Sequence, residues 1–127
     1  MIVLDTHAWI WWATDPGKLS DRAREAIERS DDAGVCAISC WEVAMLASKK
    51  RVQLDRETLL WVRQALALPR VRLLPLTPEV GVTAASLGRQ LTDPADRMIA
   101  ATALAERAPI VTRDAGLRAS RVVPTIW

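Results

Sequence analysis

Five short runs of Val, Ile and Leu divide the sequence, and most of them are continuous rather than alternating with polar residues. The runs are Ile2–Leu4, Val35–Ile38, Val71–Leu76, Ile110–Thr112 and Val122–Ile126. Such runs are typical of strands in a parallel sheet that is covered on both faces. Because helical patterns separate them, we expect an α/β fold with a mainly parallel central sheet flanked by helices.

The segments between the runs contain recognisable helix starts. The capping residues predict helices that begin at Ser20, Ser39, Asp55, Thr77 and Asp93. Of these helices, four have an expected end, near Ser30, Lys49, Leu68 and Arg107 in chain order. Proline follows Thr77 and Asp93 directly, at the first helical position. Gly34 is expected to act as a breaker after the first of these helices. In the helix from Asp55, we expect Leu59, Val62 and Leu66 to share the buried face.

The length of 127 residues is that of one domain, so residues 1–127 are expected to form a single unit. The apolar stretch Ala8–Ala13 is far shorter than the roughly 20 residues of a membrane span. Met1–Asp5 enters a strand-like run without the basic segment of a secretory signal. Cys36 and Cys40 lack metal-ligand or redox spacing, which suits a reducing compartment. We therefore expect a cytoplasmic protein.

Acidic residues occur where the predicted strands end or the following helices begin. They are Asp5, Glu42, Asp93, Asp96 and Asp114. Glu42 is expected in the first turn of its helix. Ligands of open α/β sheets bind beyond the carboxyl ends of the strands, so these five acids are expected at one rim of the sheet.

Several carboxylates held together repel one another unless a cation neutralises them. Mg²⁺ and Mn²⁺ prefer oxygen ligands, and His7 is the only histidine, so no cluster competes for zinc. A bound cation of this kind lowers the pKa of water and neutralises charge on a phosphoryl transition state. Metal-assisted hydrolysis of a phosphodiester is the chemistry that these residues predict.

Each acid also has a purely structural interpretation. Ser39 and Glu42 have the spacing of a capping box, and Asp93 with Asp96 fits an N-cap near a helix dipole. Asp5 and Asp114 could be turn residues after strands. Taken together at one rim, the five acids favour a site.

The charge of the remaining chain suits a polyanionic partner. Of the 15 acidic residues 5 belong to the predicted site, which leaves 10 against 17 Lys and Arg. Arg97 and Arg113 lie beside predicted acids in the sequence and could hold phosphate or balance charge. Lys49 and Lys50 could contact phosphates of such a partner, although interaction with the helix dipole explains them equally well.

The chain resembles the PIN-domain ribonucleases, in particular the VapC-type toxins of bacterial toxin–antitoxin pairs. The resemblance covers essentially the whole chain in the right order. The matching segments are Leu4–Ala8, Ile38–Ala44, Asp93–Ala103, Val111–Asp114 and Val123–Trp127.

The resemblance implies a PIN-like three-layer sandwich in which conserved acids bind Mg²⁺, or Mn²⁺ as a substitute. Asp5, Glu42 and Asp96 match the three core acids, and Asp114 matches a more variable fourth. Asp93 is a ligand, a group that orients a ligand, or only a helix cap. The implied reaction is endonucleolytic cleavage of structured RNA such as tRNA or rRNA, which stops translation. The implied partners are a small antitoxin that occupies the cleft and a second copy of the chain.

Two hydroxyls lie close to predicted site acids in the sequence, and the chain has six tryptophans. Thr6 follows the first acid and Thr112 precedes the last, so both hydroxyls could orient a carboxylate or a metal-bound water. Trp9, Trp11 and Trp12 cannot all face one way on a helix. Trp9 and Trp12 are expected in the core or at a dimer contact, whereas Trp11 could stack on a base or pack against a partner. Trp41 and Trp61 are expected to be core or groove-wall residues, and His7 is expected to be structural.

Three other functions compete with a nuclease. A haloacid-dehalogenase-like phosphatase normally needs a second Asp two residues after the first, where this chain has His7. A receiver domain needs a lysine late in the chain, and none follows Lys50. The strongest alternative is a non-catalytic PIN-like module that binds RNA or protein, which the full set of acids disfavours.

Overall fold

A five-stranded parallel sheet forms the middle layer of the computed structural model, which describes residues 1–127. The strands are β1 (Ile2–Leu4), β2 (Ala33–Cys36), β3 (Val71–Leu74), β4 (Ile110–Val111) and β5 (Thr125–Ile126), and their order across the sheet is β3-β2-β1-β4-β5. The expected α/β fold with a parallel sheet is confirmed. β1 has the expected bounds, and β2 begins two residues before its apolar run, which continues into α3. The other three strands are shorter than their runs, because the remaining residues of those runs belong to loops.

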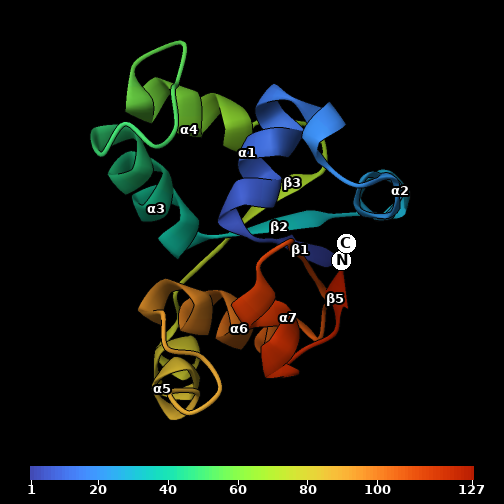
Figure 1. Cartoon of the computed structure of the whole chain (residues 1–127), viewed down its shortest axis with the longest axis vertical. Coiled ribbons are helices and arrows are strands. Elements are labelled where there is room, and N and C mark those ends of the chain that lie inside the picture. The colour runs from blue at the N-terminus through green and yellow to red at the C-terminus, as the bar shows by residue number, and fades with distance from the viewer.

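Helices cover both faces of this sheet. They are α1 (Thr6–Thr14), α2 (Asp21–Arg29), α3 (Ala37–Ser48), α4 (Thr58–Leu66), α5 (Pro78–Ser86), α6 (Pro94–Glu106) and α7 (Ala115–Ser120), with a 3-10 turn η1 at Pro16–Lys18. Figure 1 shows α5, α6 and α7 on one side of the sheet and α1, α2 and α4 on the other. None of the helices is long and apolar enough to cross a membrane.

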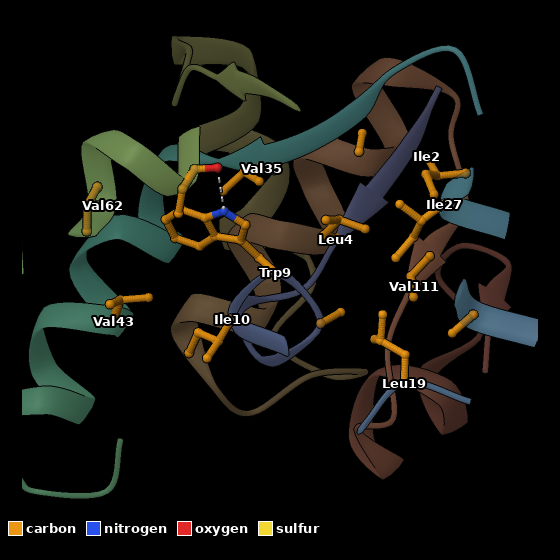
Figure 2. Close-up of a cluster of buried hydrophobic side chains, with 14 of the residues drawn as sticks. Ile2, Leu4, Trp9, Ile10, Leu19, Ile27, Val35, Val43, Val62 and Val111 are labelled. Atoms are coloured by element: carbon orange, nitrogen blue, oxygen red, sulfur yellow. Dashed lines mark hydrogen bonds between the residues drawn. The ribbon is translucent and has the colours of Figure 1, made fainter. Parts of the chain in front are cut away.

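Successive side chains of a strand point to opposite faces of the sheet, so the core is divided into two clusters. Ile2 and Leu4 of β1 belong to the cluster under α1, α2, α3 and α4, whereas Val3 belongs to the cluster under α5, α6 and α7. Figure 2 shows the first cluster, in which the fully buried Trp9 donates its indole N–H to the carbonyl of Ala65 over 3.4 Å. The central strand is therefore buried on both faces, which holds its carboxyl end in place.

The expected caps at Ser20, Thr77 and Asp93 are confirmed, since each side chain accepts a backbone N–H in the first turn of its helix. Four other helix starts differ from expectation. The cap of α3 is Cys36 rather than Ser39, and the cap of α4 is Glu57 rather than Asp55. The capping patterns predict no start for α1 or α7, whose caps are Asp5 and Asp114.

Gly34 is not a helix breaker but a buried residue in the middle of β2. A Cβ atom on it would lie 2.4 Å from Leu74 Cδ1 of the neighbouring strand β3. The glycine therefore makes room for Leu74 to reach the second core cluster.

Two predictions about core residues are wrong. Leu59 is exposed because α4 buries the face that carries Trp61, Val62 and Ala65 instead. Trp41, expected in the core or on a groove wall, is not in the core: it is 58% exposed, because α3 buries the face that carries Ser39, Val43 and Leu46. Trp9 and Trp61 are buried, as expected.

Candidate active site

The carboxyl ends of β1 and β4 form the centre of the candidate site. These two strands are neighbours, and the strand order reverses between them: β2 and β3 lie on one side of β1, and β4 and β5 lie on the other. A reversal of this kind is the place where open α/β sheets bind ligands. Asp5 directly follows β1, and Thr112 directly follows β4.

Asp5 is buried, with 6% of its surface exposed, and both of its carboxylate oxygens accept hydrogen bonds. Oδ1 accepts the Ala8 N–H over 2.8 Å as the cap of α1, and Oδ2 accepts the hydroxyl proton of Thr112. Burial raises the pKa of Asp5 from 3.8 to about 6, even though both hydrogen bonds lower it. The side chain is therefore held rigidly and binds a proton more readily than an exposed aspartate.

Glu42 lies in the second turn of α3, not in the first turn as expected, because the helix begins at Ala37. Ser39 is fully buried and caps nothing, so the capping-box interpretation is wrong. The Thr6 hydroxyl donates to Glu42 Oε1 over 2.5 Å and lies 2.9 Å from the Ser39 hydroxyl. Burial raises the pKa of Glu42 against the effect of this hydrogen bond, and the charges of Asp93 and Asp5 raise it further.

Asp93 and Asp96 stand at the start of α6. Asp93 is its N-cap, and Oδ1 accepts the N–H groups of Ala95 over 2.8 Å and Asp96 over 3.3 Å. Burial raises the pKa of Asp96 from 3.8 to about 7, and the charges of Asp93, Asp114, Glu42 and Asp5 add to the effect. Asp96 thus experiences the negative charge of all the other predicted site acids.

Asp114 caps the short helix α7, where Oδ2 accepts the Leu117 N–H over 2.9 Å. Its own N–H donates to the Thr112 hydroxyl oxygen over 2.9 Å. A chain of two hydrogen bonds therefore runs from the backbone of Asp114 through Thr112 to the carboxylate of Asp5. Capping by Asp5, Asp93 and Asp114 is compatible with a functional role, because carboxylate oxygens have further lone pairs.

The protein offsets the charge of the five acids only in part: Arg113 lowers the pKa of Asp5 and His7 lowers that of Glu42, each as the weakest influence on that pKa. The chain forms four ion pairs, and none of them involves these acids. No three acidic, histidine or cysteine side chains converge closely enough to enclose an ion by themselves. Mg²⁺ often uses only one or two carboxylates and keeps several waters. The oxygen-only donors and the unneutralised charge therefore fit a hard, partly hydrated divalent cation.

The basic residues near the predicted site differ in their surroundings. Arg97 is held by the backbone, since Nε donates to the Leu91 carbonyl over 2.6 Å and Nη2 to the Thr92 carbonyl over 3.1 Å. The Arg113 guanidinium instead lies 4.9 Å from the ring centroid of Trp11. Lys49 and Lys50 are exposed at the end of α3, about 18 Å along the helix from the sheet edge.

Comparison with known proteins shows the family. The PIN domain family matches residues 2–122. The chain belongs to the PIN-domain family. Ribonuclease VapC22 of Mycobacterium tuberculosis is 41% identical to this PIN domain over 121 residues, which are 94% of this chain and 92% of the relative.

Solved structures share the fold of this PIN domain. VapBC2 from Rickettsia felis, bound to a DNA fragment from its promoter, matches with a TM-score of 0.70 at 16% identity, over 98% of this chain and 97% of that chain. FitAcB from Neisseria gonorrhoeae matches with a TM-score of 0.60 at 24% identity, over 98% of this chain and 96% of that chain. A toxin–antitoxin complex from Klebsiella pneumoniae matches with a TM-score of 0.61 at 20% identity, over 90% of this chain and 87% of that chain.

Two features of the site have no clear signal in the sequence. Ser39 contacts Thr6 across 33 positions, but its spacing to Glu42 resembles a cap. Trp127 lies 5.8 Å from Trp11 between ring centroids, although the two residues are at opposite ends of the chain. Only the pairing of β4 with β5 brings the last residues beside α1.

Proposed function

We propose that this PIN domain is a metal-dependent endoribonuclease that acts as the toxin of a toxin–antitoxin pair and cleaves structured RNA, such as tRNA or rRNA. The main support is the gathering of Asp5, Glu42, Asp96 and Asp114 from separate segments, with each acid influencing the pKa of Asp96 and no basic side chain paired with them. The identity to a VapC ribonuclease supports the same proposal.

In this proposal, Asp5, Glu42, Asp96 and Asp114 would hold Mg²⁺, or Mn²⁺ in its place, directly or through waters bound to the ion, and Asp93 either contributes or only starts α6. A bound divalent cation would offset charge on the phosphate and make a coordinated water more acidic. Thr112 orients Asp5, and Thr6 orients Glu42. Arg113 is free to contact a phosphate, whereas Arg97 secures the loop before α6.

The reaction is hydrolysis of a phosphodiester. The oxygen of water forms a bond to phosphorus while the bond from phosphorus to the leaving ribose oxygen breaks. One of the site carboxylates accepts the proton of the attacking water, and the leaving oxygen takes up a proton from solvent. Because Asp5 is fixed by two hydrogen bonds, it is suited to positioning rather than to moving during the reaction.

The proposed protein partners are a small antitoxin that occupies the acidic cleft and a second copy of the chain. The structures of similar fold include a toxin–antitoxin complex and VapBC2, which supports an antitoxin partner. A cytoplasmic location agrees with this role, because the RNA substrate is found there.

The test is cleavage of total cellular RNA by the purified protein with Mg²⁺ or Mn²⁺, with EDTA, and after the substitution Asp5→Asn. We expect discrete fragments that require both the metal and Asp5, and no fragments above the EDTA background in the variant, because the metal ion provides the activated water. Asp31→Asn is the matched control, because Asp31 is exposed in the loop before β2, at the opposite edge of the sheet.

If folded wild type and Asp5→Asn both leave every RNA intact, the catalytic proposal fails. A non-catalytic PIN-like module that binds RNA or protein would then be the better interpretation, and the acids would serve only as caps.

A further inference from the structure

A cavity of about 310 Å³ opens beside the acidic cluster. It is lined by Asp5, His7, Trp11, Arg113, Asp114 and Ala115. Asp5 and Asp114 belong to the proposed catalytic site, so the cavity continues directly from the place where the scissile phosphate would bind. Its remaining walls are aromatic and cationic, and catalysis by the acids gives no reason for that composition.

Trp11 is the central member of this wall. His7 precedes it by one helical turn on the same face of α1, and their ring centroids are 5.7 Å apart. Trp127 packs on it from the end of the chain, with ring centroids 5.8 Å apart. These contacts hold the Trp11 ring in one orientation, although it is only partly buried.

Arg113 completes the wall from the segment after β4. Its guanidinium lies 4.9 Å from the Trp11 ring centroid, and it takes part in none of the four ion pairs of the chain. An anionic ligand would therefore not have to displace an ion-pair partner of Arg113, although Asp5 and Asp114 line the same cavity and the Arg113 charge is the weakest of the influences on the pKa of Asp5.

We propose that this cavity binds an unpaired nucleotide of the RNA next to the scissile phosphate, with the base on the Trp11 platform and a neighbouring phosphate on Arg113. The proposal rests on the proposed nuclease function. Proteins recognise unpaired RNA by stacking bases on aromatic rings or guanidinium planes, and this wall presents both. The Arg113 guanidinium has no ion-pair partner and adjoins the proposed phosphodiester-cleaving site, so RNA is favoured over an apolar peptide as the ligand of the cavity.

The test measures binding, so that cleavage is not required. Affinities for a ten-nucleotide oligoadenylate and for an abasic oligomer of equal length and charge are compared in Asp96→Asn protein, with and without Trp11→Leu. Stacking on an aromatic side chain changes affinity about five- to 150-fold per base. We expect Trp11→Leu to weaken oligoadenylate binding about tenfold and to leave the abasic oligomer almost unaffected.

Four further variants separate the contribution of the Trp11 ring from that of the Arg113 charge. Trp11→Phe keeps an aromatic face and should recover most of the affinity. Trp12→Leu alters a neighbouring tryptophan that does not line the cavity, and should have no effect. Arg113→Gln should weaken both oligomers equally, because it removes a phosphate contact, whereas Arg118→Gln on the exposed side of α7 should not.

The proposal is overturned if Trp11→Leu weakens the two oligomers equally, or weakens neither, while the protein remains folded. Equal loss would indicate a packing role for Trp11, and no loss would assign the cavity to a protein partner. Neither result affects the nuclease proposal, which is tested by cleavage in the Asp5→Asn experiment.

Discussion

Asp5 has a carboxylate that is almost completely buried and yet has no basic partner. Its two hydrogen bonds come from different sources. The bond from the Ala8 N–H is local and forms with the first turn of α1, whereas the bond from Thr112 joins residues 107 positions apart. The second bond exists only because β1 and β4 are neighbours in the sheet. Thr112 therefore connects the packing of the sheet to the chemistry of the site.

The substitution Thr112→Val tests this connection. Removing a hydrogen bond that lowers the pKa of Asp5 should raise that pKa above its present value of about 6. Titration of the carboxyl carbons by NMR in the metal-free protein measures the change. We expect nuclease activity to fall about 10- to 100-fold, as is typical when a group that orients a metal ligand is lost.

Thr102→Val is the control for this experiment. Thr102 is also buried, but its hydroxyl donates to the Met98 carbonyl within α6, so the pKa of Asp5 should not change. An unchanged pKa of Asp5 in Thr112→Val would contradict the role assigned to the Thr112 hydroxyl.

At the scale of elements, the β2–β3 pair has a tight contact that depends on a missing side chain. Gly34 is in a buried strand, and Leu74 of β3 fills the space that a Cβ atom would take. Glycine weakens a strand when nothing else needs the space. Here the gain is the burial of Leu74, which is 2% exposed, in the core under α5, α6 and α7.

Gly34→Ala should consequently destabilise the protein by about 1–3 kcal/mol, which is the usual cost of overpacking a core. Gly81→Ala is the matched control, since Gly81 lies within α5 and an added Cβ would meet no atom within 4 Å. That variant should be about 0.5–1 kcal/mol more stable than wild type, because alanine favours the helix. Denaturant unfolding measures both differences. Equal effects of the two substitutions would show that the contact with Leu74 is unimportant.

At the scale of the whole molecule, the fold concentrates negative charge at one edge of the sheet. The pKa of Asp96 is raised to about 7, and that of Asp5 to about 6, so both bind a proton more tightly in the folded chain than in the unfolded one. For such groups the free energy of unfolding is highest below the unfolded pKa and falls as pH rises toward the folded pKa. The acidic site should therefore destabilise the metal-free protein at neutral and alkaline pH.

The resulting prediction compares wild type with Asp96→Asn in EDTA at pH 5 and pH 8. Between these values wild type should lose stability relative to the variant, because only wild type gains a charge at residue 96. At pH 8, Mg²⁺ or Mn²⁺ should raise the melting temperature of wild type and do so less for Asp96→Asn, because a ligand that binds only the folded state stabilises it. Thermal unfolding at both pH values measures these effects. If the difference in melting temperature between wild type and Asp96→Asn were the same at pH 5 and pH 8, the predicted repulsion among the acids would be contradicted.

Much of the fold and part of the site are encoded in short stretches of sequence. Continuous apolar runs predict the parallel strands, and Ser20, Thr77 and Asp93 start helices as expected, because a cap depends only on the next two or three residues. The position of Asp5 after β1 is also local, since it follows from where the apolar run ends.

Tertiary structure determines which faces and which distant residues meet. Residue 34 of β2 is a glycine because Leu74 occupies the space of a Cβ atom there. Trp41 is exposed because α3 packs against the core with its other face. The contacts of Asp5 with Thr112, Thr6 with Glu42, and Trp11 with Trp127 join residues far apart in the chain. The sequence alone determined the elements and the acids at their ends, since hydrophobic pattern and capping act over a few residues. Only the packing of the sheet and helices determined the hydrogen bonds and the cavity, because these require several distant segments to be buried together.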